Sequence, residues 1–389
     1  MNSDLTYTND DNIQIGPEGA ENFVRGFLEL GSLSAPLFLI TGQKSYESSS
    51  AEKYFSSFFS GRQVIRFSDF TPNPKVDELT IALDTFKVSG AKMIIAVGGG
   101  TAIDLAKLVN YFFSTEIRPE EFMQGKRGAG DNFIPLLAVP TTAGTGSETT
   151  HFSAIYFGFK KISISDKRML PSHVWLNAVF TDSMSPYLTA CTGFDALAQA
   201  IESYWAVGST RESRQYSIKA LKLCLQHIEN AVLNPTLEHR TEMLKAAHFA
   251  GKSINVAKTT AAHAMSYALT THYGVPHGHA VAMTLPALFE ANADFTSKDV
   301  IDSRGVEHLH NIMTELCNLF AANSAKEVAQ QLRDIMVKIG LSPYWLSEHD
   351  INPQKARETI IQEINEERLS NNPRRLNRDL LLKIVSSIH

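Results

Sequence analysis

The chain has 389 residues, of which 43% are hydrophobic and 20% charged, and its formal net charge is -5. This is the composition of an ordinary globular protein, long enough for two domains and without the basic character of a nucleic-acid-binding surface. The polar, acidic start is unlike a signal peptide, and no apolar run approaches the roughly 20 residues of a membrane span. Three cysteines without CxxC spacing fit buried thiols in a reducing compartment, so we expect a cytoplasmic protein without membrane or nucleic-acid partners.

Strands and helices alternate through the first half of the chain. The apolar spacing predicts helices at 18–30, 46–59 and 76–88, and strands at 36–41, 64–67, 91–97 and 134–139. Short β-like runs follow between 154 and 181. Such alternation is typical of a parallel sheet covered on both faces by helices, so residues 1–185 are predicted to form an α/β domain.

A triple-glycine turn, VGGGTAIDLAK (97–107), follows the third strand. Glycines allow the backbone to approach a ligand closely, and the N-terminus of the following helix attracts a phosphate. Thr101 is a good N-cap, and Asp104 three residues later could complete an arrangement like a capping box. The turn is not GxGxxG, and a tight strand–helix turn without any ligand is the competing interpretation.

A second polar loop, PTTAGTGSETT (140–150), follows the fourth strand. Its hydroxyls and exposed amides could line a pyrophosphate or a ribose, or it could be a plain surface loop. Ligands of open α/β sheets bind at the carboxyl ends of the strands. Two such loops at strand ends of one sheet therefore favour a binding site.

The second half is predicted to be an all-helical domain, residues 186–389. Helical periodicity covers 188–207, 213–228, 236–254, 260–272, 280–293, 306–320, 325–339 and 378–388. In the first of these helices Asp195, Gln199 and Glu202 lie on nearly one face. Because burying an unpaired carboxylate is expensive, Asp195 needs a partner, which is either a divalent metal or a basic side chain elsewhere.

Four histidines gather in TTAAHAMSYALTTHYGVPHGHAVAMTLP (259–286): His263, His272, His277 and His279. His263 and Tyr267 share one helix face. Gly274-Val275-Pro276 ends that helix and is predicted to place His277 on the loop that follows. A helix face and a loop histidine could enclose a metal ion or a reacting carbonyl.

With GGGTAID, PTTAGTGSE, GFDALAQAIE and HAMSY followed by HG in this order, the chain resembles the iron-containing (group III) alcohol dehydrogenase family, related in fold to dehydroquinate synthase. The likeness spans nearly the whole chain, including KISISDKRMLP (161–171) and NPRRLNRDLL (372–381). It implies a Rossmann-like dinucleotide-binding domain, a helical metal-binding domain and a cleft between them. It also implies an NAD(P)-dependent alcohol dehydrogenase or aldehyde reductase that forms a homodimer or a larger homo-oligomer.

The resemblance also assigns site residues. A divalent metal, Fe2+ or Zn2+, is held in the family by an aspartate and three histidines, and Asp195, His263 and His277 match three of these ligands. The fourth position carries Gln199, whose carboxamide oxygen or a water would complete the site. The implied cofactor-binding residues are Gly42, Gly98, Gly99, Gly100, Thr101, Asp104, Thr141, Thr142, Thr145, Ser147 and Lys161.

Tyr267 stands where most family members have a proton-relaying histidine. A tyrosine hydroxyl with a reference pKa of about 10 could still donate, and His279 could take over this role. His272 is expected to be structural. Gly42 occupies the place of the aspartate that NAD-preferring relatives carry after the first strand, so the cofactor could be NADH or NADPH.

Several segments resemble the branch of the family that reduces phosphonoacetaldehyde to 2-hydroxyethylphosphonate. Lys258, Thr259 and Thr260 precede the metal-binding helix and could seat an anionic group, although Lys258 could equally be a solvated surface residue. We therefore expect metal-dependent, NAD(P)H-linked reduction of a small aldehyde, with the metal polarising the carbonyl. The alternatives are a reductase of another aldehyde (sulfoacetaldehyde, a semialdehyde or a neutral one), a lyase of the dehydroquinate synthase type, or a metal-free nucleotide-binding protein.

Overall fold

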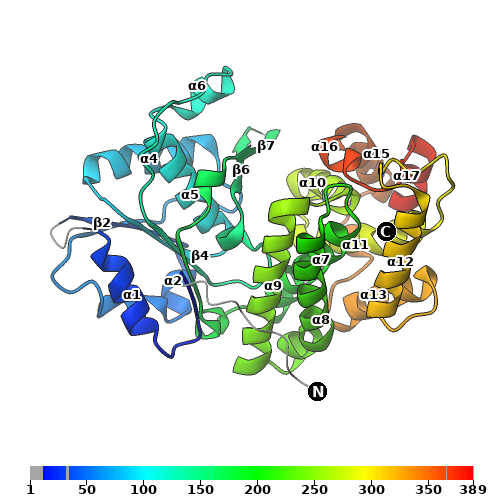
Figure 1. Cartoon of the computed structure of the whole chain (residues 1–389), viewed down its shortest axis with the longest axis horizontal. Helices are drawn as coiled ribbons and strands as arrows, with labels where there is room; N and C mark the ends of the chain where they lie inside the picture. Colours follow the sequence, from blue (N-terminus) through cyan, green and yellow to red (C-terminus); the bar gives the residue numbers. More distant parts are fainter. Residues whose placement is uncertain (1–11, 32–34, 159, 365, 389) are drawn as a thin grey trace. The chain divides into compact units, whose positions relative to one another are not determined.

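The structure is a computed structural model that describes residues 12–31, 35–158, 160–364 and 366–388. Residues 1–11, the polar segment predicted not to be a signal peptide, lie outside the described residues. The chain divides into two compact units, Met1–Met184 and Ser185–His389 (Figure 1). No helix in the described ranges combines the length and the apolar composition needed to cross a membrane.

The first unit contains a six-stranded sheet with the order β1-β8-β5-β4-β2-β3, in which every neighbouring pair is parallel. The predicted parallel sheet is therefore confirmed. Its first strand was not predicted, because a run of three half-buried residues is too short to show a pattern. The strands are β1 (Ile13–Ile15), β2 (Leu37–Thr41), β3 (Val64–Phe67), β4 (Ile94–Gly98), β5 (Leu136–Pro140) and β8 (His173–Leu176).

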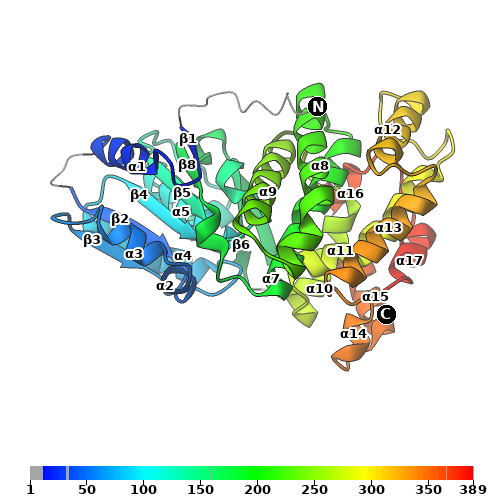
Figure 2. The same cartoon turned by 90° about the horizontal axis from the view of Figure 1, so that it is seen from below.

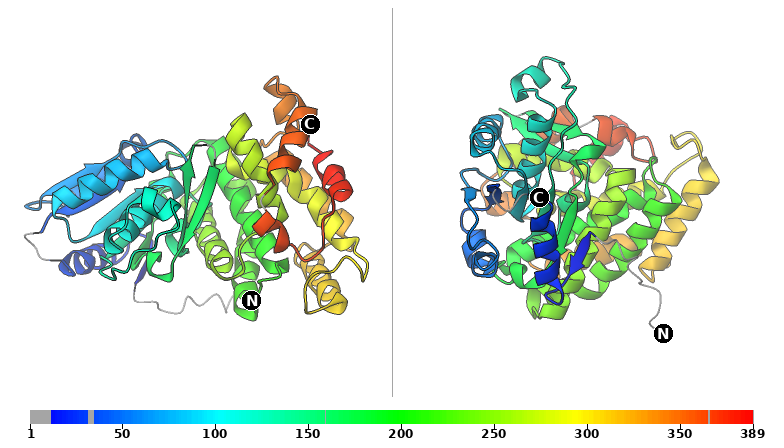
Figure 3. Two further views of the ribbon diagram at one scale, coloured as in Figure 1. Left: turned by 90° about the horizontal axis from the view of Figure 1, so that it is seen from above. Right: turned by 60° about the vertical axis from the view of Figure 1, so that its left-hand side comes forward.

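Helices cover both faces of this sheet (Figure 3). Strand residues alternate between the faces: Phe38 and Ile40 belong to the apolar core beneath α4 and α5, whereas Leu37 and Leu39 belong to the core beneath α1 and α3. Burial on both sides explains why the central strands are continuous apolar runs. The helices are α1 (Ala20–Glu29), α2 (Ser45–Ser48), α3 (Ala51–Ser56), α4 (Val76–Ser89), α5 (Gly100–Ser114) and α6 (Pro119–Met123).

Two local differences from the prediction occur in this unit. The predicted helix 46–59 is split into α2 and α3 at Ser50, whose φ of 61° is left-handed and cannot continue a helix. The β-like runs after residue 150 form an antiparallel hairpin of β6 (Phe152–Phe157) and β7 (Lys160–Ser165), apart from the main sheet, before β8 joins it.

The second unit is helical, as predicted. Figure 2 shows α8 beside α9, and both pack against α7. Buried hydroxyls of Ser203, Ser217 and Ser253 bond to one another at 2.7 to 2.9 Å where these three helices meet. Small side chains there permit close helix packing. The helices are α7 (Pro186–Trp205), α8 (Arg211–Leu233), α9 (Leu237–Ala257), α10 (Ala261–Tyr273), α11 (His277–Ala293), α12 (Val306–Leu319), α13 (Ala325–Lys338), α14 (Trp345–Glu348), α15 (Pro353–Glu363), α16 (Glu366–Ser370) and α17 (Arg378–Val385).

Candidate functional site: nucleotide loops and a metal centre

The glycine turn and the 140–150 loop lie against each other, as expected from their positions at strand ends. Gly98 of β4 is paired with Pro140 of β5. A Cβ atom at Gly100 would approach the Thr145 side chain to 2.8 Å, and one at Gly99 would approach Thr142 to 3.3 Å. A side chain at Gly100 would therefore force Thr145 to move, whereas one at Gly99 would only crowd Thr142. The free N–H groups of the first turn of α5 then face the carboxyl edge of the sheet, where a phosphate can bind.

Thr101 and Asp104 do not form the cap that the sequence suggested. The N-cap of α5 is Gly99, which places Thr101 inside the first turn. The Asp104 carboxylate instead accepts the Ser147 hydroxyl through Oδ1 and the Ala154 amide at 3.1 Å through Oδ2. Asp104 and Ser147 therefore hold the 140–150 loop on α5, and their predicted contact with the cofactor stays a prediction.

Lys107 completes this arrangement and was missed by the sequence analysis. Its fully buried ammonium donates to the carbonyls of Ser147 (2.9 Å), Thr150 (3.1 Å) and Phe152 (2.7 Å), and lies 3.2 Å from Asp104. Burial lowers the pKa of Lys107, and the Asp104 carboxylate opposes that shift. A lysine within the apolar run LAKLVNYFF was the available signal, because buried lysines need partners.

Of the other predicted cofactor residues, Gly42 adjoins the glycine turn, where a Cβ at Gly98 would lie 3.4 Å from the Gly42 nitrogen. Gly42 directly follows β2, and a Cβ there would collide with the Ser45 hydroxyl. Lys161 lies in β7, opposite Tyr156 of β6. Thr141 donates its amide to the Gly98 carbonyl at 3.0 Å, which joins the two loops a second time.

Three predicted metal ligands come together in the second unit from three different helices. The ligand atoms of Asp195 (α7), His263 (α10) and His277 (α11) all lie within 4.8 Å of one another. Asp195 Oδ1 is 3.3 Å from His263 Nε2 and 3.9 Å from His277 Nε2. Asp195 and His263 are buried, whereas His277 is partly exposed, so a cation here would be accessible from one side.

The position of His277 differs from the prediction. It is the first residue of α11 rather than part of a loop. The next residue, Gly278, touches α7 so closely that an added Cβ would overlap the Cys191 carbonyl and lie 3.1 Å from the Asp195 Cβ. Only glycine allows this approach, and it brings His277 to Asp195.

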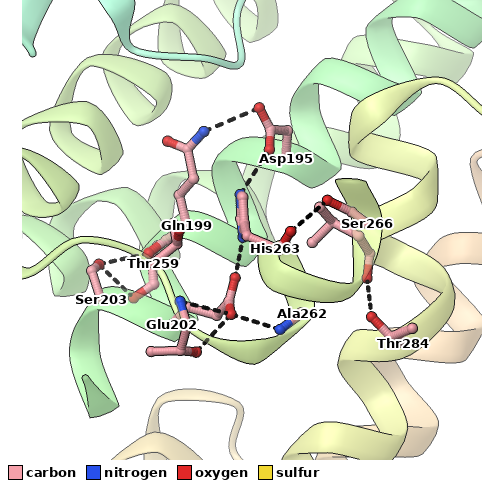
Figure 4. Close-up of polar contacts among 12 residues, drawn as sticks. Asp195, Gln199, Glu202, Ser203, Thr259, Ala262, His263, Ser266 and Thr284 are labelled. Atoms are coloured by element: carbon pink, nitrogen blue, oxygen red, sulfur yellow. Dashed lines mark hydrogen bonds and ion pairs between the residues drawn. The ribbon is translucent and has the colours of Figure 1, made fainter. Parts of the chain in front are cut away.

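Glu202 orients the His263 ring (Figure 4). One carboxylate oxygen accepts from His263 Nδ1, and the other accepts from the Thr260 amide (3.1 Å), the Thr260 hydroxyl (2.6 Å) and the Ala262 amide (3.0 Å). A proton held on Nδ1 leaves Nε2 as the lone-pair donor toward the Asp195 side, as in many carboxylate–histidine–metal arrangements. Burial opposes the charged imidazolium, but Glu202 and Asp195 raise the pKa of His263 to about 10. These two carboxylates therefore create a strongly cation-attracting position.

Gln199 supplies a fourth possible donor. Its Nε2 donates to Asp195 Oδ2 at 3.0 Å, which also appears in Figure 4, while its Oε1 is buried and has no hydrogen-bond partner among the described residues. An orphaned buried oxygen costs roughly 1–3 kcal/mol. Here Nε2 is the Gln199 atom that faces Asp195, and turning the amide over would bring Oε1 to that side. Two imidazoles, a carboxylate and this carboxamide are donors that fit a divalent metal.

The two candidates for proton transfer are placed differently. The Tyr267 ring stacks on His277, with ring centroids 6.1 Å apart and planes 18° from parallel. His279 is fully buried: Nδ1 contacts the Tyr187 hydroxyl at 2.9 Å and Nε2 contacts the Ser342 carbonyl at 2.8 Å. Both nitrogens of His279 therefore have internal partners, which favours a role as a link between helices over the predicted role in proton transfer.

The expected anion seat before α10 is also used internally. The amides at the start of α10 bind the Glu202 carboxylate, so that helix end already holds an anion of the chain itself. Lys258 pairs with Glu367 at 2.8 Å on the surface, and the Thr259 carbonyl accepts from Asn371 at 3.0 Å. Because Glu202 already binds these amides, the Lys258 ammonium and the Thr259 side chain are the better candidates for the predicted anion seat. His272 pairs with Glu363 at 2.6 Å, in keeping with a structural role.

Comparison with known proteins agrees with this geometry. Residues 13–178 match the family described as iron-containing alcohol dehydrogenase, and residues 189–389 match the C-terminal part of the Fe-containing alcohol dehydrogenase family. The chain is 30% identical to the phosphonoacetaldehyde reductase of Streptomyces viridochromogenes over 76% of this chain and 75% of that protein. It is also 30% identical to the lactaldehyde reductase of Escherichia coli K12, over 70% and 74%.

A solved structure gives the same result for the fold. The sulfoacetaldehyde reductase of Bifidobacterium kashiwanohense, solved in complex with NAD+, superposes with a TM-score of 0.82 at 28% identity. The match covers 97% of this chain and 96% of that one.

Proposed function

Because this chain belongs to the iron-containing alcohol dehydrogenase family, we propose that it reduces a small anionic aldehyde, with phosphonoacetaldehyde as the first candidate, to the primary alcohol. The chain is an NAD(P)-dependent alcohol dehydrogenase or aldehyde reductase. The observation that carries the assignment of the centre is the convergence of Asp195, His263 and His277, with the Gln199 carboxamide bonded to Asp195.

Asp195, His263, His277 and Gln199 Oε1 would hold the divalent ion, with Glu202 fixing the tautomer of His263. A bound Fe2+ or Zn2+ supplies Lewis-acid polarisation of the aldehyde carbonyl. Two imidazoles with two oxygen donors suit either ion. The role of the protein is to present these four donors on three packed helices, so that little reorganisation is needed when substrate binds.

The loops of the first unit would bind the dinucleotide. The glycine turn at Gly98–Gly100 leaves room for a pyrophosphate at the N-terminus of α5, and Thr141, Thr142 and Thr145 line the adjacent loop. Asp104, Ser147 and Lys107 keep that loop in place. The nicotinamide cofactor supplies the hydride, and the protein positions it.

Tyr267 is the proposed proton-handling residue, because it stacks on the ligand His277. Its hydroxyl would hold and pass a proton between solvent and the oxygen of the substrate. His279 is proposed only as a positioning residue, since both of its nitrogens are hydrogen-bonded.

The proposed preference for an anion rests on Lys258 and Thr259 and on the relatives that act on phosphonoacetaldehyde and sulfoacetaldehyde. The Lys258–Glu367 pair is about half exposed on the lysine side and more so on the glutamate side. Such surface pairs contribute little, about 0–1 kcal/mol, so a doubly charged phosphonate could replace Glu367 as the partner of Lys258.

The test is NADH and NADPH oxidation with phosphonoacetaldehyde, sulfoacetaldehyde, succinic semialdehyde, lactaldehyde and propanal. We expect the anionic aldehydes to have the highest kcat/KM. Lys258→Ala should raise KM for phosphonoacetaldehyde by about tenfold or more while leaving propanal unchanged, since charge-assisted contacts are worth roughly 1.5–3 kcal/mol. Lys338→Ala is the matched control, because Lys338 is another exposed lysine paired with a glutamate, Glu229.

Preference for lactaldehyde or propanal over every anionic aldehyde would contradict the proposed substrate class. Turnover of a phosphorylated substrate without net NAD(P)H consumption would favour the lyase alternative, because lyases of that type regenerate their cofactor.

A further inference from the structure

The Arg66 side chain is held against the end of β2, the strand that pairs with β4 and its glycine turn. It lies in the edge strand β3, and its Nε donates to the Thr41 hydroxyl at 2.9 Å. One terminal nitrogen donates to the Gln43 carbonyl at 3.2 Å, and the guanidinium lies over the Tyr46 ring at 4.9 Å. A cation fixed by two hydrogen bonds and an aromatic face is pre-organised for a ligand.

The guanidinium has capacity left for such a ligand. Its third polar contact is a 3.4 Å pair with Glu47, whose side chain is 60% exposed. An arginine has five N–H donors, so two remain without a partner among the described residues. They belong to the two terminal nitrogens, the pair that binds a phosphate in a bidentate manner.

The segment that Arg66 touches is the place where a dinucleotide domain reads the adenine-side ribose. β2 pairs with β4, whose end carries the glycine turn, and Thr41 lies beside Val97. In doubly wound folds an acidic residue near this point binds the ribose 2′-OH, whereas an arginine accommodates a 2′-phosphate. Here the residue after Thr41 is Gly42, which has no carboxylate. The space of its missing Cβ is taken by the Ser45 hydroxyl.

We propose that Arg66, assisted by the Ser45 hydroxyl and by the exposed Lys44, forms a seat for the 2′-phosphate, so that the protein prefers NADPH to NADH. This inference rests on the dinucleotide site of the proposed function. Glu47 is the one carboxylate that contacts Arg66 in the described part of the chain. The exposure of Glu47 lets it turn into solvent when a phosphate replaces it.

Nucleotide fragments test this seat without metal or aldehyde. Equilibrium binding of 2′,5′-ADP and of 5′-ADP is measured by calorimetry on wild type, Arg66→Leu, Arg66→Lys and Arg25→Leu. Arg25 is the charge-matched control, because it pairs with Glu21 on the surface of α1 in the same unit. The 5′-ADP arm also reports whether each variant keeps a folded nucleotide site.

We expect wild type to bind 2′,5′-ADP about tenfold or more tightly than 5′-ADP, which corresponds to one bidentate charged contact. Arg66→Leu should abolish this preference with about the same 5′-ADP affinity, Arg66→Lys should keep part of it, and Arg25→Leu should keep all of it. Equal binding of the two fragments by wild type, or tighter binding of 5′-ADP, would overturn the proposal and point to Glu47 reading a ribose hydroxyl. If wild type prefers 2′,5′-ADP but reduces no aldehyde, only the proposed function is contradicted. If wild type binds neither fragment, both the proposed function and the 2′-phosphate seat are overturned.

Discussion

Replacing Glu202 with glutamine should disable the metal site without removing any ligand. Glu202 Oε1 accepts three hydrogen bonds, two from Thr260 and one from the Ala262 amide. The glutamine of the variant must therefore place its oxygen, not its NH2 group, toward these three donors. The new NH2 group then faces His263 Nδ1, which must become an acceptor. The ring proton moves to Nε2, the atom 3.3 Å from Asp195 Oδ1 that the metal would need. His263 is thus left in the wrong tautomer.

The size of the loss in metal affinity follows from the other orientation that the glutamine amide could take. Turning the amide to restore the His263 tautomer points an NH2 group at three donors and leaves at least one buried N–H unsatisfied, which costs about 1–3 kcal/mol. Since 1.36 kcal/mol corresponds to a factor of ten, Glu202→Gln should weaken metal binding roughly 10- to 100-fold, the usual range for partners of metal-binding histidines.

The assay is competition between the metal-free protein and a chromophoric chelator for Zn2+, with circular dichroism as a check on folding. Glu315→Gln is the control, because Glu315 is an exposed carboxylate of the same unit that accepts from the Tyr204 hydroxyl at 2.5 Å. A folded Glu202→Gln protein whose Zn2+ affinity stays within about twofold of wild type would refute the tautomer argument.

Three further predictions concern other parts of the chain. Gln199→Leu should weaken Zn2+ binding about tenfold if the orphaned oxygen is a ligand, and an unchanged affinity would show that it is not. Lys107→Met should lower the melting temperature and weaken 5′-ADP binding. Breaking the buried Lys107–Asp104 pair costs about 3–5 kcal/mol, and three carbonyls lose their hydrogen-bond donor. A Tm equal to that of wild type would contradict this. Burial between Phe23 and Phe27 lowers the pKa of His173, so the unfolded chain takes up the proton first and stability is lost as pH falls below about 6.5. His173→Asn should therefore lose less Tm between pH 7.5 and 5.5 than wild type, and identical losses would rule out this contribution.

The strands, the helices and the positions of the loops could be predicted because they depend on local sequence pattern. The strand at 64–67 was predicted to the residue, and the polar loops were placed at the strand ends that do carry them. The metal ligands could be listed from the resemblance, but their convergence depends on how α7, α10 and α11 pack. Gly278 shows the reason: its importance lies in the contact with Cys191 on another helix, which no local pattern contains.

For several predicted site residues the fold adds contacts that the sequence could not show. Thr101, Asp104 and Thr260 were assigned to ligands or caps from their chemistry, whereas the fold supplies internal partners for each of them. The partner of Lys258 is 109 residues away in the sequence, so spacing gives no information about it. Glu202 was recognised as lying on the ligand face, but only the structure shows that it binds His263.

The most direct test of the central claim is a deuterium-transfer experiment on the metal-loaded protein. The cofactor carries deuterium at the transferable position of nicotinamide C4, the substrate is phosphonoacetaldehyde, and the product is analysed by NMR and mass spectrometry. We expect one deuterium on the new carbinol carbon for each NAD(P)H oxidised, and loss of this transfer in Asp195→Ala. Transfer that persists in Asp195→Ala after chelation, or consumption of substrate with the labelled cofactor unchanged, would contradict it.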